Sequence, residues 1–337
     1  MPHATPLGEF ELIQRFFTRS LKSGSPVRLG VGDDCALVQP RPGYELAIST
    51  DMLVEGRHFL STVDPARLGH KALAVNLSDL AACGATPLGF TLALALPRAD
   101  EAWLSGFSQG LLNLAQAHGC ELIGGDTTQG PLNICITVFG EIPLRNSKSQ
   151  ALLRSGAQPG DDIYVSGTLG DARLALEVFR GTVQVPAPVF EAARERLEQP
   201  TPRIALGRAL LGVASAACDI SDGLSGDLGH ILQRSGVGAT LDARQAIQLL
   251  GVKRYPVNAR GVFDSERALS FVLNGGDDYE LVFTAPPQAA DAVAAAAQAS
   301  ATPVLKIGRI DAEPGLRLWN GEAVPQTLKP AGFDHFK

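Results

Sequence analysis

The chain lacks the cysteine patterns that build disulfide frameworks and zinc sites. Its five cysteines are widely spaced, odd in number, and none belongs to a CxxC pair. This usage is typical of reduced proteins inside the cell. We therefore expect a cytoplasmic protein without disulfides and without a structural zinc ion.

Long apolar segments and basic clusters are also missing. Residues 80–97 carry no charge, but Gly84, Pro87 and Gly89 interrupt them, and a spanning helix needs about 20 continuous apolar residues. The 29 Lys and Arg residues form no basic run, and the formal net charge is −6. We expect neither a membrane segment nor a dedicated nucleic-acid surface.

Charged residues make up only 19%, whereas hydrophobic residues make up 45%, a balance typical of globular rather than disordered chains. At roughly 100–200 residues per domain, the 337 residues predict two domains. The polar stretch 143–160 places the boundary near residue 150, giving domains 1–150 and 151–337. Strand-like and helical patterns mix without a regular βαβ alternation, which favours an α+β fold.

Aspartate is abundant for so modest a charge content: 20 of the 35 acidic residues are Asp and 15 are Glu. Six acidic motifs stand out, most of them after an apolar, strand-like run. They are GDD at 32–34, STD at 49–51, SD at 78–79, GGDTT at 124–128, DISDG at 219–223 and GGDD at 275–278. Gly-Asp after a strand is usually a turn, but six such motifs in both halves indicate a common purpose.

We expect strands over 44–50, ending at Asp51, and over 120–124, followed by a turn that holds GGDTT. Asp64 and Pro65 predict the start of a helix to about residue 82. Asp79 would then lie near the negative end of the helix dipole, where a cation would stabilise it. A further helix is expected from Ser221 or Asp222 to about Arg234, and a strand over 280–285.

Carboxylates without His or Cys partners select hard cations, and Mg²⁺ usually joins a few Asp residues to substrate phosphates. Glycines let backbone N–H groups approach phosphate closely, and Ser221 at a helix start would do the same. The acidic, Gly-rich motifs therefore predict magnesium-dependent phosphoryl chemistry. GxxxxGK[ST] and HRD…DFG motifs are absent, which excludes a P-loop NTPase and a protein-kinase fold.

Together these motifs resemble the thiamine-monophosphate kinase family. The resemblance rests on VGDDCALV, ISTDMLVEGRHF, KALAVNLSDLAACGATP, LIGGDTTQG, LLRSGAQPGDDIYVSGTLGDA, ACDISDGL, NGGDDYELVFT and GFDHF, in this order over residues 7–336. The wider superfamily also holds aminoimidazole ribonucleotide synthetase, selenophosphate synthetase and a hydrogenase-maturation protein. The stretch STDMLVEGRHF separates the chain from those relatives.

The resemblance implies ATP-dependent phosphorylation of thiamine monophosphate to thiamine diphosphate by in-line transfer, with several Mg²⁺ ions. It further implies a homodimer in which the N-terminal mixed or antiparallel sheets, carrying the metal and ATP sites, pair into a barrel-like interface. The C-terminal α/β domain would complete the nucleotide cleft.

The resemblance also carries over individual site residues. The implied metal ligands are Asp34, Ser49, Thr50, Asp51, Asp79, Asp126, Asp219 and Asp222, with Asp51, Asp79 and Asp126 as the catalytic set. The implied ATP contacts are Gly125, Asp126, Arg154 and Ser221. The implied substrate contacts are His58, Phe333 and Asp278, with Asp277 as the alternative to Asp278.

Three other hypotheses remain open from the sequence. A related enzyme of the same superfamily, such as a ring-closing ATP-dependent synthetase, would share the motifs. A regulatory protein would bind divalent cations or nucleotide without turnover. In the third, the aspartates only form turns, and Mg²⁺ and an ATP analogue would not bind together.

Overall fold

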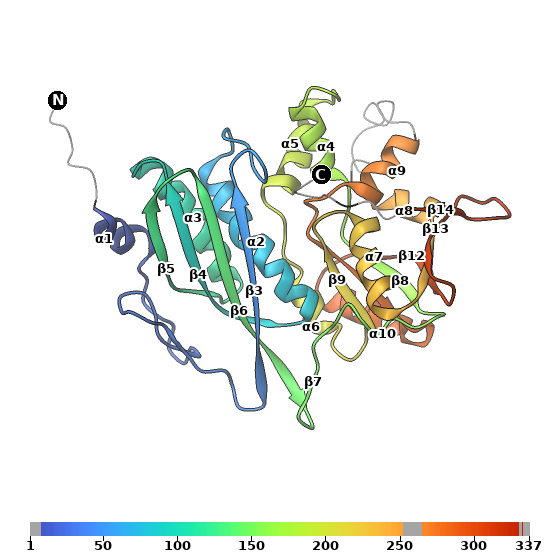
Figure 1. The fold of residues 1–337 in the computed structure, drawn as a ribbon, viewed down its shortest axis with the longest axis horizontal. Helices are drawn as coiled ribbons and strands as arrows, with labels where there is room; N and C mark the ends of the chain where they lie inside the picture. Colours follow the sequence, from blue (N-terminus) through green and yellow to red (C-terminus); the bar gives the residue numbers. More distant parts are fainter. Residues whose placement is uncertain (1–7, 252–264, 330–331, 333–337) are drawn as a thin grey trace. The chain divides into compact units, whose positions relative to one another are not determined.

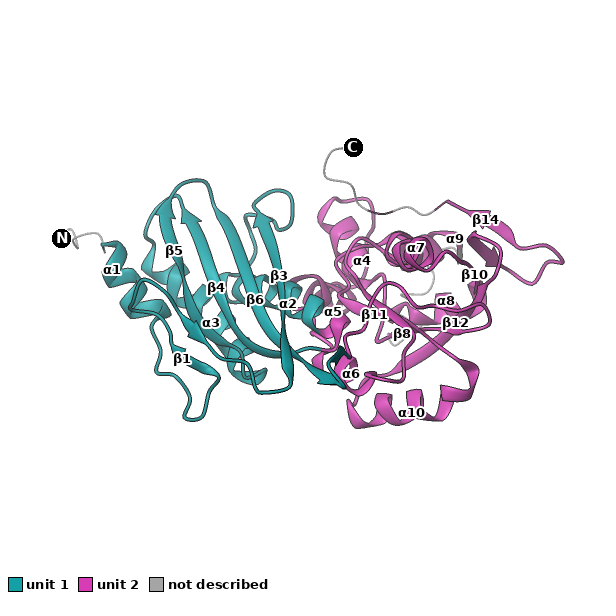
Figure 2. Ribbon diagram, turned by 60° about the horizontal axis from the view of Figure 1, so that its bottom comes forward, with its two compact units in different colours: residues 1–80, 85–149 teal, residues 81–84, 150–337 magenta. Residues whose placement is uncertain are grey.

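The computed structural model describes residues 8–251, 265–329 and 332. The chain divides into two compact units (Figure 2): residues 1–80 with 85–149, and residues 81–84 with 150–337. Each unit has its own sheet and helices, and each is described separately below. None of the described helices is both long enough and apolar enough to cross a membrane.

The first unit is built on a mixed sheet in which β6 lies between β3 and β4, and β5 follows β4 at the edge. Only the β4–β5 pair is parallel. In chain order its elements are α1 (Glu9–Leu12), η1 (Ile13–Phe17), β1 (Val27–Leu29), β2 (Leu37–Val38), β3 (Tyr44–Val54), α2 (Pro65–Cys83), β4 (Thr86–Leu96), α3 (Glu101–Ala117), β5 (Glu121–Gln129), β6 (Asn133–Arg145) and β7 (Lys148–Ser149).

Helices α2 and α3 lie along one face of this sheet (Figure 1). On that face β6 contributes Ile134, Ile136 and Val138, all nearly inaccessible to solvent. The opposite face carries three exposed apolar side chains of β3, Leu46, Ile48 and Met52, which point the same way because strand residues alternate in direction. The sheet therefore has one covered and one open face.

The second unit has a seven-stranded sheet in the order β14-β13-β10-β12-β8-β11-β9, antiparallel except for β10–β13. Its strands are β8 (Asp162–Ser166), β9 (Ala216–Ile220), β10 (Gly238–Asp242), β11 (Glu280–Ala285), β12 (Val304–Asp311), β13 (Gly315–Trp319) and β14 (Gln326–Leu328). Its helices are α4 (Asp171–Phe179), α5 (Ala187–Glu198), α6 (Ile204–Ala209), α7 (Leu224–Ser235), α8 (Ala243–Ala246), η2 (Ile247–Leu249), α9 (Ser265–Asn274), η5 (Pro287–Ala289) and α10 (Ala290–Ala299).

The mixture of helices with mixed and antiparallel sheets is the expected α+β class. Within the described residues both sheets are open and neither closes into a barrel. The barrel implied by the family resemblance would form between two copies, so it stays a proposal.

Two expectations about acidic motifs are wrong. Strand β3 continues through Asp51 to Val54, because all eleven of its residues pair with β6. GGDTT is not a turn but part of β5, which pairs in parallel with β4 as far as Gln129. In both cases a neighbouring strand distant in sequence supplies the backbone partners that keep a polar segment extended.

Candidate functional site

The acids of β3 and α2 lie together on the covered side of the first sheet. Asp51 is opposite Ile136, which is nearly fully buried, so it points toward the helices. Its backbone N–H donates to Asn76 Oδ1 of α2 at 3.0 Å. Two residues before Asp51 and on the same face, Ser49 Oγ donates to Asp79 Oδ2 at 2.5 Å. The expected position of Asp79 in the last turns of a helix is confirmed.

Asp126 lies on β5, away from this group. The register places it in the row of Ala93, Cys135 and Met52, one row from Asp51 and on the opposite face. Since β3 and β5 are three strand spacings apart, the two backbones are separated by about 14 Å. One copy of the sheet does not gather Asp51 and Asp126 around a single ion.

Position 125 requires glycine because there is no room for a side chain. Its φ is +147°, and a Cβ there would lie 1.9 Å from the carbonyl oxygen of Leu92 on β4. Any side chain would push β5 off its partner strand. Gly125 therefore holds the exposed Asp126 at its place on the sheet.

Thr50 and Asp34 are both exposed. Thr50 Oγ1 lies 2.8 Å from Thr137 Oγ1 across the β3–β6 ladder, on the open face. Asp34 lies between β1 and β2, where its backbone N–H donates to Asp33 Oδ1 at 2.8 Å. Both offer oxygen donors, but on different elements.

His58 lies in the turn that follows β3. Its Nδ1 accepts the backbone N–H of Val54 at 2.9 Å, which places the proton of the neutral ring on Nε2. The buried Lys71 Nζ lies 3.4 Å from the His58 carbonyl oxygen. The imidazole is therefore oriented as an Nε2–H donor, a form that suits an acceptor such as a phosphate oxygen.

In the second unit, two predicted ligands occupy the end of β9 and the loop after it. Asp219 is a buried residue of β9, and Asp222 is half-buried in the loop. A third carboxylate, Asp227, was not predicted from the sequence; it is buried in α7 and accepts backbone N–H groups from Asp222 and Gly223, each at 3.1 Å. Its position in the sequence, four residues after the Gly of DISDG, could have indicated that it lies close to this motif.

The electrostatics of this cluster mark it as crowded with negative charge. Burial, and then the charge of Asp222, raise the pKa of Asp227 to about 7. The pKa of the exposed Arg154 is raised by Cys218 first and then by Asp219 and Asp227. Because burial also raises the pKa of the Cys218 thiol, the thiol is neutral, and the carboxylates are the charges that Arg154 balances.

Ser221 does not begin a helix, contrary to expectation. Helix α7 starts at Leu224, after an N-cap Gly223 whose φ is +118°. The carbonyl oxygen of Ser221 accepts the backbone N–H of Asp277 at 2.9 Å. Ser221 therefore links the loop after β9 to the segment before β11. If Ser221 contacts nucleotide, it does so from a loop and not from the N-terminus of a helix.

Asp278 is fully buried. Both of its carboxylate oxygens accept from the N–H of Gly170, at 3.1 and 3.0 Å, and burial raises its pKa well above the usual range. The neighbouring Asp277 is half-buried and has a φ of +67°. Exposure therefore favours Asp277 over Asp278 for a substrate contact. Phe333 lies outside the described residues.

The donors fit Mg²⁺ by their chemistry, since all are carboxylate or hydroxyl oxygens. Within the described parts of the chain, no three His, Cys, Asp or Glu side chains are grouped to hold an ion. Mg²⁺ is commonly held by one or two carboxylates together with substrate phosphates and water, rather than by a complete protein cage. Asp51 with Asp79, and Asp219 with Asp222, match that mode.

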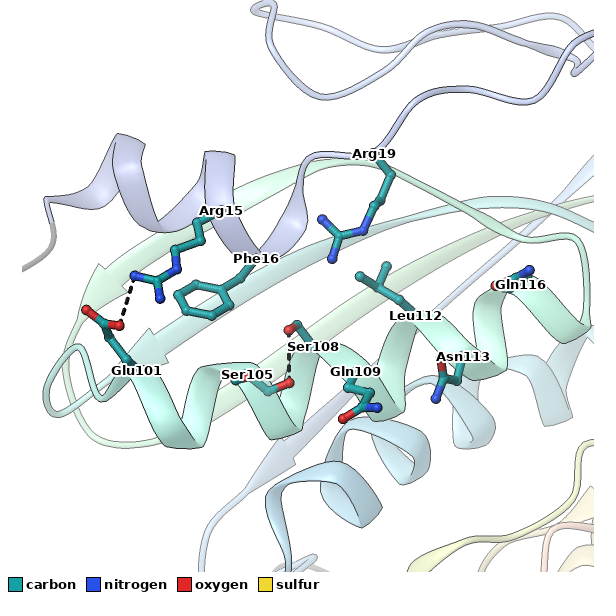
Figure 3. Close-up of a pocket in the computed structure, with 10 residues that line it drawn as sticks. All are labelled: Arg15, Phe16, Arg19, Glu101, Ser105, Ser108, Gln109, Leu112, Asn113 and Gln116. Carbon is teal, nitrogen blue, oxygen red and sulfur yellow. Dashed lines mark hydrogen bonds and ion pairs between the residues drawn. The ribbon is translucent and has the colours of Figure 1, made fainter.

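A groove of about 580 Å³ elsewhere in the first unit includes none of these residues. It lies between η1 and α3 (Figure 3), over Phe16 and Leu112. An ion pair joins Arg15 Nη1 and Glu101 Oε2 at 2.8 Å across it. Both side chains are about half exposed, so the groove is an ordinary solvated surface feature.

Comparisons with known proteins identify the family of the chain. The family model of the AIR synthase related protein N-terminal domain matches residues 32–142, and that of the C-terminal domain matches residues 158–319. The chain is 46% identical to the thiamine-monophosphate kinase of Salmonella typhimurium and 44% identical to that of Haemophilus influenzae, covering 98% of both chains in each case.

Solved structures give the same result. A thiamine-monophosphate kinase from Stenotrophomonas maltophilia K279a superposes with a TM-score of 0.80 at 44% identity, over 90% of this chain and 93% of that one. AaThiL, complexed with AMPPCP and TMP, superposes with a TM-score of 0.72 at 30% identity, over 88% and 89%. With close relatives matched over nearly their whole length, the chain belongs to the thiamine-monophosphate kinase family.

Proposed function

We propose that this enzyme transfers the γ-phosphoryl group of ATP to thiamine monophosphate, giving ADP and thiamine diphosphate. The observation that carries the proposal is the 46% identity to a thiamine-monophosphate kinase over 98% of both chains. The AaThiL complex, which holds AMPPCP and TMP, supports it. We assign both substrates to this chain because of its similarity to these relatives.

The acceptor explains why the site needs no general base. A phosphate monoester is largely dianionic near neutral pH, so one of its oxygens attacks the γ-phosphorus without losing a proton. The bond from the γ-phosphorus to the ADP oxygen breaks as the new P–O bond forms. The chain's task is then to position two anions in line and to offset their repulsion.

We assign the donors of the first unit to this task. Asp51 and Asp79 would hold Mg²⁺ on the covered side of the sheet, with Ser49 orienting Asp79. Asp126 would serve the nucleotide from β5, beside Gly125. Bound Mg²⁺ would neutralise phosphate charge and polarise the transferred group.

In the second unit, Asp219 and Asp222 would add metal ligands, and Arg154 would contact the nucleotide. This role of Arg154 is consistent with its exposed side chain and with the nearby carboxylates of Asp219 and Asp227. His58, with its proton on Nε2, would donate to thiamine monophosphate. In this division, residues 1–150 supply metal binding, ATP binding and dimerisation, and residues 151–337 complete the nucleotide cleft.

The assay is direct. ATP, Mg²⁺ and thiamine monophosphate are mixed with the protein, and ADP and thiamine diphosphate are quantified by chromatography. We expect one thiamine diphosphate per ADP and no ADP without the acceptor. Turnover with a formyl-amidine nucleotide or with selenide instead would assign the chain to a related superfamily activity and overturn the proposal.

We propose also that the open face of the first sheet is a homodimer interface. Leu46, Ile48 and Met52 leave 44%, 60% and 52% of their surfaces exposed on one strand, and such a row is typical of an interaction surface. A second copy of the same sheet would cover it and yield the expected barrel-like interface.

Ile48→Asp should convert the dimer to monomer in light scattering after size exclusion. Leu37→Asp is the matched control, because Leu37 on β2 is 56% exposed but does not belong to this row. A wild-type protein that is monomeric, or an Ile48→Asp variant that stays dimeric, would contradict the interface.

A further inference from the structure

Asp227 occupies an unusual place for a buried carboxylate. It lies in the first turns of α7 with only 2% of its surface exposed. Its Oδ2 accepts two backbone N–H groups, those of Asp222 and Gly223, each at 3.1 Å. Both donors precede the helix, so the side chain reaches back over the loop that joins β9 to α7.

The same loop is held from its other side by the segment before β11. The N–H of Asp277 donates to the carbonyl of Ser221 at 2.9 Å, and Ser225 Oγ donates to Asn274 Oδ1 at 2.7 Å. A Cβ on Gly223 would meet the carbonyl carbon of Asn274 at 3.1 Å. The backbone of Asp222 is thus fixed between two segments.

A structural cap alone would not require a carboxylate. An asparagine oxygen accepts backbone N–H groups equally well at helix starts, and a buried negative charge next to Asp222 destabilises the folded chain. An acidic group at this place is useful where a cation is to be bound by the loop that it holds.

We propose that Asp227 is a positioning residue of the phosphoryl-transfer site: through the N–H groups of Asp222 and Gly223 it sets the direction of the Asp222 carboxylate toward Mg²⁺-nucleotide. The inference rests on the function proposed above. It adds a residue that acts behind the proposed ligands Asp219 and Asp222 without contacting substrate itself.

Three variants separate positioning from stability. Asp227→Ala removes the acceptor, and Asp227→Asn keeps an oxygen that accepts both N–H groups. Asp161→Ala is the matched control for Asp227→Ala, because Asp161 is 4% exposed, accepts the N–H of Gln158 and the hydroxyl of Ser215, and lies at the opposite end of β9.

We expect Asp227→Ala to raise the Mg²⁺ concentration for half-maximal rate by about tenfold or more. Asp227→Asn keeps the acceptor but loses the acidic group, so it should raise that concentration by a smaller factor, about threefold, and Asp161→Ala should lower the unfolding temperature without changing the Mg²⁺ dependence. Equal Mg²⁺ dependence of Asp227→Ala and the control would overturn the inference.

Amide hydrogen exchange gives a readout that does not need turnover. In the wild type the N–H groups of Asp222 and Gly223 should be protected, and in Asp227→Ala they should exchange about tenfold faster or more. Unchanged protection would overturn the positioning role, even for a variant too unstable to assay. Absence of thiamine-monophosphate-dependent turnover in the wild type would instead overturn the proposed function, with the exchange result still standing.

Discussion

The two units carry similar Gly/Ser-Asp motifs but treat their carboxylates differently. In the first unit, Asp51 and Asp79 are half-buried and Asp126 is exposed, all on or beside one sheet. In the second unit, Asp219 and Asp278 are buried. Motifs that look the same in sequence therefore supply accessible carboxylates in the first unit, whereas in the second unit some of their carboxylates are buried.

The difference follows from what surrounds each motif. In the first unit, Asp126 is exposed on the open face of the sheet, and Asp51 and Asp79 are only half-buried, with Ser49 Oγ donating to Asp79. A loop enclosed by β9, α7 and the segment before β11 removes water, which raises the pKa of Asp227 to about 7 through burial and the charge of Asp222. Changes in the first unit should thus affect rate, and changes in the second should affect stability as well.

The largest effect is expected at Glu280 in the second unit. This fully buried carboxylate pairs with Arg196 and Arg203 and accepts from Ser166 Oγ at 2.6 Å. Glu280→Ala leaves two cations without their partner, so the free energy of unfolding in urea should fall by about 3–5 kcal/mol. Glu101→Gln in the first unit is the control, since the exposed pair with Arg15 contributes about 0–1 kcal/mol. Equal losses of stability in the two variants would contradict the difference between the buried and the exposed ion pair.

The next effect concerns the open donors. Asp51→Asn and Asp126→Asn should each lower kcat by about 100-fold to 1,000-fold, with the urea midpoint unchanged because neither side chain is buried. Asp100→Asn is a matched control, since an asparagine N-cap keeps the bonds to Ala102 and Trp103. A rate within twofold of wild type would remove the residue from the proposed site.

The pH dependence of stability should reveal Asp227. Its pKa is raised from 3.8 to about 7 in the folded chain, so between these values the folded state holds a proton that the unfolded state has lost. The stabilisation is complete below pH 3.8 and is lost as pH rises through 7. From pH 5 to pH 7, wild type should lose about 2 kcal/mol relative to Asp227→Asn in EDTA. Parallel urea profiles would show that the carboxyl is ionised throughout.

The smallest effect is expected at Ser49. Ser49→Ala removes the hydroxyl that donates to Asp79, so the Mg²⁺ concentration for half-maximal rate should rise by about threefold to tenfold. Thr137→Val, which removes a hydroxyl bond on the opposite face of the sheet, should change it less. The reverse order would mean that the open face, not the covered one, holds the ion.

Sequence patterns predicted the regular apolar elements well. Helix α2 runs over Pro65–Cys83 and strand β11 over Glu280–Ala285, close to the expected ranges. Their apolar spacing repeats with the period of the element, so local residues decide the conformation. Asp79 was placed correctly for the same reason, because its position depends on one helix only.

Polar segments were predicted less well. GGDTT contains the residues of a turn, yet β4 pairs with it and keeps it extended. Ser221 and Asp222 resemble a helix start, but Gly223 takes the cap position at a φ of +118°. In each case a backbone partner far away in the chain outweighs the local preference.

The sequence by itself determined the family and the α+β class, because these depend on residue types and their order. The tertiary structure decided which aspartates remain accessible, that Asp51 and Asp126 lie on opposite faces of one sheet, and that Asp227 lies behind Asp222. Burial and register arise from contacts between distant segments, and no local pattern encodes them.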